Sequence, residues 1–444
     1  MGWDVDQGER GPTMAVKFLS FLGTGDYKEC RYELGTRRSS LTRFVQHAIL
    51  ELLEETRPTE AYIFLTPEAE EFNWIATPKR GYPGLSFALS DLRRTKPLEI
   101  HTVPIPSQQD DDAIWTSFHA VLSVLQPGDR VVFDITHSMR YQPMLALLVL
   151  HFARVLREVQ LGGVYYGYIE KLGPSKQIDD IPVEKRIAPV VDVTALADLQ
   201  EWITRTYAFV AAGRAEPLRQ WVKEARTRAP SSWQWAEELT DSWSSVTAAL
   251  YTNRALTIPD TARRAAKHLA EAPKEMPPAM GPLRALFEHA NRSIAPLGSQ
   301  DPVESGLAAI LWCIDHGLIQ QAYTQTRELI ITAVGLAFGL PVQGKEERDR
   351  IEELVTVAQK FAANPRNRKP LENMTYPRDR DLVFTLSRHT GLLNDFDEVR
   401  KLRNDLSHCG DTHSPAYFET WLREHMPVVK EHLLRFWNTR QSRR

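Results

Sequence analysis

The periodicity of the chain changes near residue 195, and this change constrains the fold more than any other feature of the sequence. Before it, short apolar runs alternate with segments of helical spacing at residues 15–21, 41–53, 61–65, 111–125, 130–135, 143–155 and 164–169, with a weaker strand pattern at 98–103. Strands that alternate with helices form right-handed βαβ units and a mostly parallel sheet. After residue 195 only helical patterns follow. We therefore expect an α/β, Rossmann-like N-terminal domain followed by an all-α C-terminal domain.

Turn-rich breaks divide the 444 residues further. Residues 1–13 are polar and are expected to be a flexible extension, with the α/β domain at 14–194. Breaks that contain proline separate the later helices, at 229–231, 258–259, 272–282 and 364–377. We expect a helical connecting segment at 195–300 and a terminal helical bundle at 301–444. Within the helical part, Trp233, Trp235 and Trp243 are expected to pack in a core.

Net charge and cysteine content exclude several classes of protein. A formal charge of −3 argues against a protein that coats nucleic acid through bulk charge, while a local basic cleft remains compatible with it. Cys30, Cys313 and Cys409 form no CxxC pair, so we expect free thiols in a reducing cytoplasm and no metal site. No apolar stretch approaches 18 residues and no secretory signal is found. We therefore expect a cytoplasmic protein without a membrane segment.

Two polar, turn-rich segments lie at the ends of predicted strands, at residues 23–27 and 134–140. In an open parallel sheet, ligands bind beyond the carboxyl ends of the strands. Backbone N–H groups of a glycine turn and of a helix N-terminus donate to phosphate or ribose oxygens. Hydroxyl groups add further donors, and the imidazole and guanidinium groups of His137 and Arg140 can add positive or stacking contacts. The candidate ligand-binding residues are Gly23, Thr24, Gly25, Thr136, His137, Ser138, Met139 and Arg140.

Known nucleotide-binding motifs are absent from both segments. There is no GxxxxGK[ST] P-loop, and the run GTGDYK lacks the third glycine of a dinucleotide-binding fingerprint. On the residues alone, the two segments are also compatible with ordinary strand-to-helix turns.

Three stretches of the chain resemble the CRISPR-associated CARF–HEPN ribonucleases of type III systems, the family with a DxTHG motif. They are FLGTGDYKECRYEL (21–34), DITHSMRYQPM (134–144) and RIAPVVDVTALADLQEW (186–202). Ser138 stands where the family motif has glycine, and serine can also occupy a helix N-cap. The resemblance implies a CARF domain that binds cyclic oligoadenylate, with cyclic tetra-adenylate as the commonest ligand of this branch. It also implies a homodimer or a higher even oligomer.

The HEPN domain of the same family carries an R-x(4–6)-H motif, and this chain contains three R-x4-H matches. With 13 histidines, about one such match is expected by chance. The match at 263–268 has a second arginine directly after the first, and the match at 284–289 has alanine there. The match at 403–408 has asparagine there, and it lies in the terminal helical domain, where the family places its motif. We therefore select Arg403, Asn404 and His408 as the candidate catalytic residues.

Residues 396–408 have the pattern of an amphipathic helix, whose apolar stripe is Phe396, Val399, Leu402 and Leu406. Arg403 and His408 are five positions apart, or roughly 140° round such a helix, so they would not meet on one straight helix. A cleft between two copies, each supplying one pair, resolves this and agrees with the family's dimeric site. Three residues are expected to line or brace the helix that faces the motif: Tyr323, Arg327 and Glu328.

The chemistry that the resemblance implies is attack by a 2′-OH of single-stranded RNA on the adjacent phosphate, without a metal. His408 would act as general base or acid, Arg403 would stabilise the developing charge, and Asn404 would orient the helix or the phosphate. Two other functions remain open. One is a non-catalytic cyclic-nucleotide sensor that acts through a partner. The other is a HEPN nucleotidyltransferase, which would need a nucleotide-binding motif that we do not find. An ordinary amphipathic helix with a capping histidine is the structural alternative.

Overall fold

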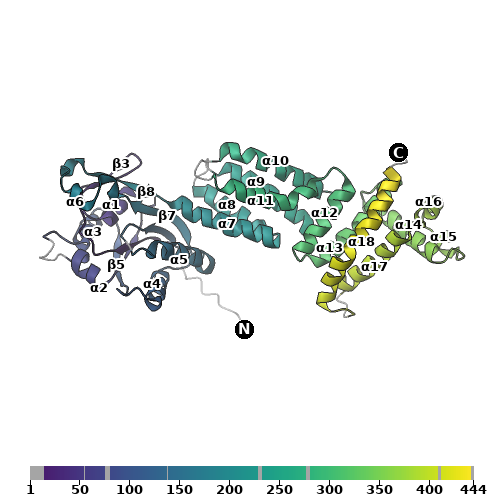
Figure 1. Ribbon diagram of the computed structural model, residues 1–444, viewed down its shortest axis with the longest axis horizontal. Helices are drawn as coiled ribbons and strands as arrows, with labels where there is room; N and C mark the ends of the chain where they lie inside the picture. The colour runs from purple at the N-terminus through teal and green to yellow at the C-terminus, as the bar shows by residue number, and fades with distance from the viewer. Residues whose placement is uncertain are drawn as a thin grey trace, which may run out of the picture. The chain divides into compact units, whose positions relative to one another are not determined.

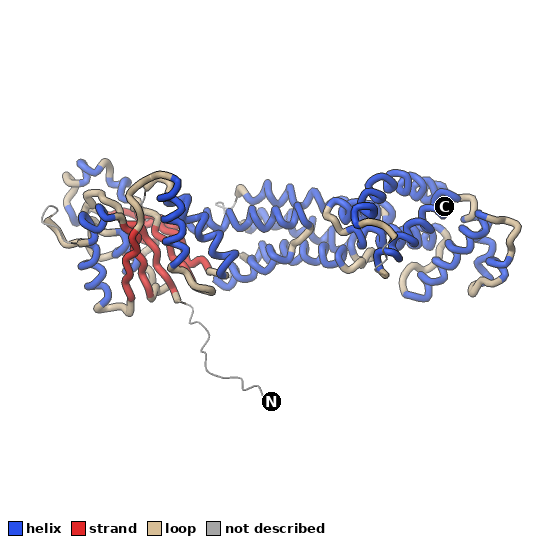
Figure 2. Tube along the Cα trace, turned by 90° about the horizontal axis from the view of Figure 1, so that it is seen from below, coloured by secondary structure: helices blue, strands red, loops and turns tan. Residues whose placement is uncertain are grey.

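The computed structural model describes residues 15–54, 56–75, 81–137, 139–228, 233–276, 281–408 and 412–441. The chain divides into two compact units between Glu201 and Trp202. Within the described residues, every strand lies in the first unit (red in Figure 2) and the second unit is built from helices. An α/β part followed by a mostly helical part is therefore confirmed as the order of the fold.

The first unit is organised around one sheet with the strand order β3-β2-β8-β7-β6-β1-β4-β5. Strands β7, β6, β1, β4 and β5 run parallel to one another, whereas β8 is antiparallel to β7. The predicted mostly parallel sheet is thus confirmed. The strands are β1 (Val16–Leu22), β2 (Arg31–Leu34), β3 (Arg37–Arg38), β4 (Glu60–Leu65), β5 (Glu99–Pro104), β6 (Arg130–Asp134), β7 (Gln160–Gly167) and β8 (Ile187–Asp192).

Helices cover both faces of this sheet (Figure 1). Both faces of the sheet are apolar and need cover, because successive side chains of a strand point to opposite faces. In β1, Phe18 and Leu22 pack into one apolar cluster, whereas Leu19 and Phe21 pack into another. The first cluster contains the buried faces of α1 and α3, and the second those of α4 and α5. The helices of this unit are α1 (Val45–Leu52), α2 (Pro67–Ala69), α3 (Leu85–Arg93), α4 (Asp111–Ser123), α5 (Gln142–Arg157) and α6 (Ser175–Ile178), with the short helical turns η1 (Glu70–Trp74), η2 (Ile169–Leu172) and η3 (Val183–Lys185).

The strand order reverses between β1 and β6. From β1 the chain adds β4 and then β5 on one side, and it afterwards adds β6 and β7 on the other side. The connections that leave β1 and β6 therefore lead to helices on opposite faces of the sheet. A crevice beyond the carboxyl ends of two such strands is the usual ligand position in open α/β sheets.

The predicted elements of this unit are all present, with small shifts at their ends. Helix α4 begins where the acidic run predicted it, because the Asp110 carboxylate accepts the Ala113 N–H at 2.9 Å. Helix α1 starts later than expected, after Phe44, whose backbone is extended. The strands β2, β3 and β8 and the helix α3 were not predicted. β2 and β3 are short and at the sheet edge, so their apolar alternation is too brief to be recognised.

The second unit is helical throughout its described part. Its aromatic core contains Trp202, Trp221 and Trp243, each at most 2% exposed, and Trp233 and Trp235 pack beside them, as expected. None of the described helices of the chain is long and apolar enough to cross a membrane. The helices are α7 (Thr194–Ala212), which crosses the division, α8 (Glu216–Arg228), α9 (Gln234–Tyr251), α10 (Ile258–Glu275), α11 (Leu283–Ile294), α12 (Pro302–Asp315), α13 (Ile319–Ala337), α14 (Lys345–Ala363), α15 (Lys369–Glu372), α16 (Arg380–Leu386), α17 (Thr390–Ser407) and α18 (Pro415–Gln441), with the turns η6 (Ala295–Gly298) and η7 (Pro377–Asp379).

A buried ion pair links the start of β1 to the turn before β6. The Lys17 ammonium donates to Asp129 Oδ2 at 2.7 Å and to the Val124 carbonyl at 2.7 Å, and both charged side chains are only 4% exposed. Asp129→Ala would leave the ammonium buried beside Glu60 alone, 3.8 Å away. We expect this variant to lower the free energy of unfolding by about 3 kcal/mol, measured by urea denaturation. A loss below about 1 kcal/mol would mean that the pair behaves as a solvent-screened one.

Candidate functional site

A cavity of about 330 Å³ lies at the carboxyl ends of β1, β4, β5 and β6. It is lined by Leu22, Gly23, Thr24, Gly25, Tyr27, Thr66, Ile105, Thr136, His137, Met139 and Gln142. Six of the eight predicted ligand-binding residues are among them, from two segments more than a hundred residues apart in the sequence. Arg140 is not a lining residue and its side chain is exposed. Ser138 lies outside the described residues.

The carboxylate of Asp134 organises the β6 side of this cavity. It is fully buried at the end of β6, where it accepts the Ser20 hydroxyl of β1 at 2.7 Å and the backbone N–H of Thr136 at 3.0 Å. Burial raises the pKa of Asp134 to about 6, against the opposing effect of the hydrogen bonds from Thr136 and Ser20. Asp134 therefore ties β1 and β6 together where their connections diverge.

The hydroxyl of Thr136, which the sequence predicted as a donor to the ligand, is engaged within the protein. Its one hydrogen is directed at Asp134 Oδ1, at 2.5 Å, and its oxygen accepts the Gly167 N–H from the end of β7 at 2.8 Å. A hydroxyl has one hydrogen and two lone pairs, so Thr136 retains only one lone pair for a ligand. Thr136 mainly fixes the path of the loop that carries His137.

The glycine segment is held against His137 by Tyr27. The Tyr27 ring stacks on the His137 ring with centroids 3.9 Å apart, and the Tyr27 hydroxyl accepts the Gly23 N–H at 3.0 Å. A Cβ atom at Gly23 would lie 2.9 Å from that hydroxyl, so this approach requires glycine. Asn73 completes the arrangement, because its amide nitrogen donates to the carbonyls of Gly23 and Gly25 at 2.8 and 2.9 Å.

His137 is a neutral ring at physiological pH. Burial lowers its pKa to about 4, and its Nε2 atom is buried without a hydrogen-bond partner among the described residues. The sequence analysis allowed a positive or a stacking contact here, and the structure supports the stacking one. Among the predicted ligand-binding residues, the only cation left is Arg140.

Several residues of this site escaped the sequence analysis. Thr66 and Ile105 directly follow β4 and β5, so the strand-end rule that selected Gly23 would have found them too. Gln142 lies at the first turn of α5, where its side-chain Oε1 accepts the Met139 N–H at 2.8 Å. Asn73 has no sequence signal, because a single buried amide in a helical turn is recognisable only from its partners.

In the second unit, the candidate catalytic residues lie at the C-terminal end of α17. His408 caps this helix, with its N–H bonded to the Asn404 carbonyl at 3.0 Å, and its side chain is exposed. The Asn404 side-chain oxygen accepts from the Arg403 guanidinium at 3.2 Å. Asn404 thus touches both other residues. Three members of the expected stripe, Phe396, Val399 and Leu402, are buried, whereas Leu406 is half-buried.

Arg403 differs from the arginines of the other two R-x4-H matches in its pairing. Arg263 pairs with Asp260 and donates to the Gly298 carbonyl, and Arg284 pairs with Glu288 at 3.0 Å. Among the described residues, no carboxylate pairs with Arg403, whose guanidinium bonds to Asn404, and its buried Nε has no hydrogen-bond partner. A guanidinium with spare donors can receive an anion from outside the chain, which is what the predicted role requires.

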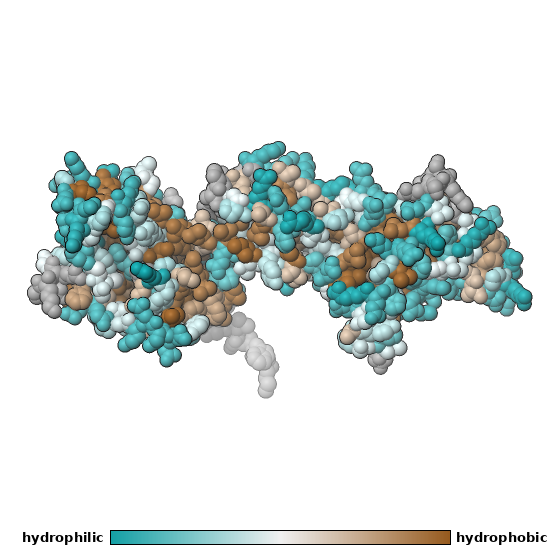
Figure 3. All heavy atoms as spheres, viewed as in Figure 1, coloured by the Kyte–Doolittle hydropathy of each residue, from teal (hydrophilic) through white to brown (hydrophobic). Residues whose placement is uncertain are grey.

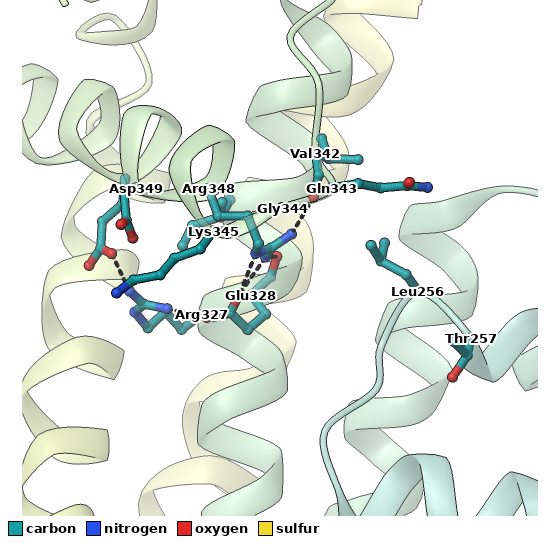
Figure 4. A pocket seen from close by; sticks show the side chains of 12 residues that line it. Leu256, Thr257, Arg327, Glu328, Val342, Gln343, Gly344, Lys345, Arg348 and Asp349 are labelled. Carbon is teal, nitrogen blue, oxygen red and sulfur yellow. Dashed lines mark hydrogen bonds and ion pairs between the residues drawn. The ribbon is translucent and has the colours of Figure 1, made fainter.

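A second cavity, of about 670 Å³, lies between the loop before α10 and the helices α13 and α14 (Figure 4). Its charged side chains largely neutralise one another. Glu328 pairs with both Arg327 and Arg348, and Arg327 also pairs with Glu352. Arg327 and Glu328 therefore brace α13 against α14, while the buried Tyr323 donates to the Phe418 carbonyl of α18 at 3.0 Å. Within the described residues, no group of three histidine, cysteine or acidic side chains is placed to hold a metal ion.

Comparisons with known proteins give one partial relative. No protein-family model matches the chain. The CRISPR-associated protein MJ1674 of Methanocaldococcus jannaschii is 34% identical over 109 residues. These residues are 24% of this chain and 16% of that relative, so the match spans about a sixth of the relative's length.

The lowered pKa of His137 predicts a loss of stability in mild acid. Between its usual pKa of 6.5 and about 4, the unfolded chain binds a proton that the folded chain does not. The stability present above pH 6.5 is therefore lost as the pH falls toward 4, by about 3 kcal/mol from this residue. Urea denaturation at pH 7 and pH 4 should show a smaller decrease for His137→Asn than for the wild type. Equal decreases in the two proteins would show that His137 titrates normally in the fold.

Proposed function

We propose that this chain is a CRISPR-associated ribonuclease that cyclic oligoadenylate activates in the cytoplasm. Residues 14–194 would sense the activator, 195–300 would connect, and 301–444 would cut single-stranded RNA. The observation that carries the proposal is the convergence of residues 23–25 with Thr136, His137 and Met139 on one cavity at the strand ends. Both segments belong to the stretches that resemble the CARF–HEPN family. The partial match to a CRISPR-associated protein supports the CRISPR-related part of the proposal.

The lining of the cavity suits a nucleotide better than a simple anion. It offers backbone groups of a glycine turn, the stacked rings of Tyr27 and His137, and apolar contacts from Leu22 and Ile105. Stacked rings and apolar walls favour a base, whereas the exposed Arg140 could reach phosphate from the rim. Because His137 is neutral, we expect it to contribute through its ring and Nε2 rather than through charge.

The end of α17 supports a 2′-OH mechanism. The exposed imidazole of His408 is available to accept the proton of the 2′-OH or to donate one to the leaving 5′-oxygen. The unpaired donors of Arg403 would stabilise the negative charge that develops on the phosphate. Asn404 is hydrogen-bonded to the Arg403 side chain and to the His408 backbone, so it would keep Arg403 and His408 in fixed relative positions.

An exposed apolar face on α5 supports the expected homodimer. Met144, Leu148, Phe152, Val155 and Leu156 lie on α5 and are between 47% and 77% exposed. Trp115 of α4 is 60% exposed and joins this α5 face through Phe118, whose ring contacts both Trp115 and Phe152. In Figure 3, apolar surface gathers where Figure 1 labels α5.

The size and position of the α5 face favour a second copy of the chain as its partner. Six half-exposed large side chains amount to roughly 600 Å² of apolar surface, close to the roughly 800 Å² per partner of a stable interface. The face begins two residues after Gln142, which lines the cavity. A twofold axis at α5 would therefore bring two cavities together. A single 330 Å³ cavity is near the lower limit of about 300 Å³ for ligand sites, and two are better matched to a ring of four nucleotides.

We predict that the purified full-length chain cleaves single-stranded RNA when cyclic tetra-adenylate is added, and that cleavage continues in excess EDTA. A 2′-OH attack needs no metal and leaves a 5′-OH and a 2′,3′-cyclic or 3′-phosphate. Gel analysis of end-labelled RNA and mass spectrometry of the products measure both points. DNA and 2′-O-methyl RNA should stay intact, because they lack the nucleophile.

His408→Ala and Arg403→Ala should each reduce this cleavage by about 10²-fold or more while activator binding is unchanged. His268→Ala and His289→Ala are the matched controls and should cleave like the wild type. Products with a 5′-phosphate, or activity that EDTA abolishes and Mg²⁺ restores, would contradict the mechanism. Activator binding without any RNA cleavage would instead favour a non-catalytic sensor.

We predict that the chain is a dimer that binds one cyclic tetra-adenylate per two chains. Leu148→Glu with Phe152→Glu places two charges on the α5 face and should yield a monomer that neither binds the ring tightly nor is activated. Analytical ultracentrifugation gives the mass, and calorimetry gives the stoichiometry. A monomer that is fully activated, or one ring per chain, would argue decisively against the shared site.

Phe87→Glu is the matched control for the α5 variant. Phe87 lies on α3, over the other face of the sheet, and is 65% exposed. This variant should remain a dimer with normal activation. Thr136→Ala with Arg140→Ala should lose activation while the dimer persists, because these residues shape the site and not the α5 face.

A further inference from the structure

Cleavage by a 2′-OH needs two proton transfers, and the R-x4-H motif supplies one imidazole per chain. The attacking hydroxyl loses a proton as the new P–O bond forms, and the leaving 5′-oxygen gains one as its P–O bond breaks. Arg403 cannot serve as the second group, because a guanidinium does not release its proton in proteins. Within one chain, a second proton-transfer group at the end of α17 must therefore be a side chain other than His408 and Arg403.

Asp405 and His413 form an imidazole–carboxylate pair at this place. The His413 Nδ1 lies 3.1 Å from Asp405 Oδ2, and the Thr412 hydroxyl lies 3.4 Å from the other oxygen of the same carboxylate. The Asp405 side chain is 13% exposed and that of His413 is 31% exposed. A carboxylate at Nδ1 fixes the ring and leaves Nε2 as the atom available for proton transfer.

Aromatic packing holds His413 at this position. Its ring stacks on Tyr417 with centroids 4.2 Å apart and meets the edge of Phe418 at 5.7 Å. The backbone of Phe418 is in turn bonded to the buried Tyr323 of α13. Tyr323, whose predicted role was to brace the motif, thus fixes the start of α18 and with it the ring of His413.

The pair lies beside His408 rather than elsewhere on α17. Asp405 precedes His408 by three residues, and positions three apart are neighbours on one helix face, with Cβ atoms about 5–6 Å from each other. One carboxylate therefore has His413 bonded to it and His408 next to it. The two imidazoles are brought to the same end of the helix from α17 and from the segment that precedes α18.

We propose that His413 is a second proton-transfer residue of the RNA-cleavage site and that Asp405 positions it; this rests on the proposed ribonuclease function. One of His408 and His413, as a neutral imidazole, takes the proton of the 2′-OH while that oxygen bonds to phosphorus. The other, as an imidazolium, gives a proton to the 5′-oxygen while the P–O5′ bond breaks. The products are a 2′,3′-cyclic phosphate and a 5′-OH, with no net gain or loss of protons and no redox change.

The chain offers a matched control for a purely structural role of such a pair. His432 of α18 bonds through Nδ1 to Asp395 of α17 at 2.8 Å, and its side chain is also 31% exposed. Gly391 packs directly against the His432 ring, because a Cβ at this glycine would lie 2.7 Å from ring atoms. The His432 pair therefore joins α17 to α18 two helical turns before the motif, and its removal reports the structural cost alone.

The test compares His413→Ala, His413→Gln and Asp405→Asn with His432→Ala, His408→Ala and the wild type, all as activated full-length protein. We expect His413→Ala and His413→Gln to reduce kcat by about 10²-fold with little change in KM, and Asp405→Asn to reduce it less. His432→Ala should stay close to the wild-type kcat. An RNA whose scissile 5′-oxygen is replaced by sulfur adds the decisive readout, since a thiolate leaves without being protonated.

If each histidine carries out one of the two proton transfers, the sulfur substrate restores cleavage in the variant that lacks the proton donor. It then restores cleavage in only one of His408→Ala and His413→Ala. Normal cleavage by His413→Ala, a loss no larger than that of His432→Ala, or the same response of both variants to sulfur overturns the proposal. Inactive His408→Ala together with active His413→Ala refutes this inference alone. A wild type that does not cut RNA refutes the proposed function, and the inference with it.

Discussion

The buried carboxylate of Asp134 is the interaction on which the N-terminal site depends. It stands where the strand order reverses, between β1 and β6, and it binds Ser20 of β1 as well as both polar groups of Thr136. The Thr136 hydroxyl in turn accepts the Gly167 N–H at the end of β7. Three neighbouring strands are therefore joined at their carboxyl ends by one acid, and the loop that carries His137 has little freedom to take another path.

The rest of the site follows from this fixed loop. His137 offers its ring to Tyr27, Tyr27 accepts the Gly23 N–H, and Asn73 holds the carbonyls of Gly23 and Gly25. The loop ends at α5, whose first turn lines the cavity and whose outer face is apolar. In the proposed dimer, a change in the packing of two copies at α5 would therefore alter the shape of the cavity. This connection is the physical basis on which a shared ligand could favour one arrangement of a dimer.

Sequence periodicity predicted the parallel strands and the long helices because each buries a continuous apolar face over many residues. It missed β2, β3 and β8, since these strands are short or, in β8, contain Pro189 and end in exposed residues. The strand-end rule brought Gly23, Thr136 and His137 to one cavity, but it could not tell that the Thr136 hydroxyl is used internally. Pairs such as Asp405 and His413 carry no sequence signal, because a spacing of eight positions across the end of a helix does not by itself predict a contact.

A buried polar atom without a hydrogen-bond partner does not by itself identify a ligand-binding site. Such an atom costs about 1–3 kcal/mol if nothing satisfies it. The described residues include several in the tryptophan core, such as the indole nitrogens of Trp202, Trp221 and Trp243, which line neither of the two cavities described above. The unpaired Nε2 of His137 differs because it belongs to a residue that lines a cavity. The unpaired Nε of Arg403 differs because this guanidinium has no carboxylate partner among the described residues and belongs to the same helix end as the exposed His408. Under the proposed function, a nucleotide at the cavity and a phosphate at the end of α17 would be the missing partners, and binding them would offset a cost that the core atoms retain.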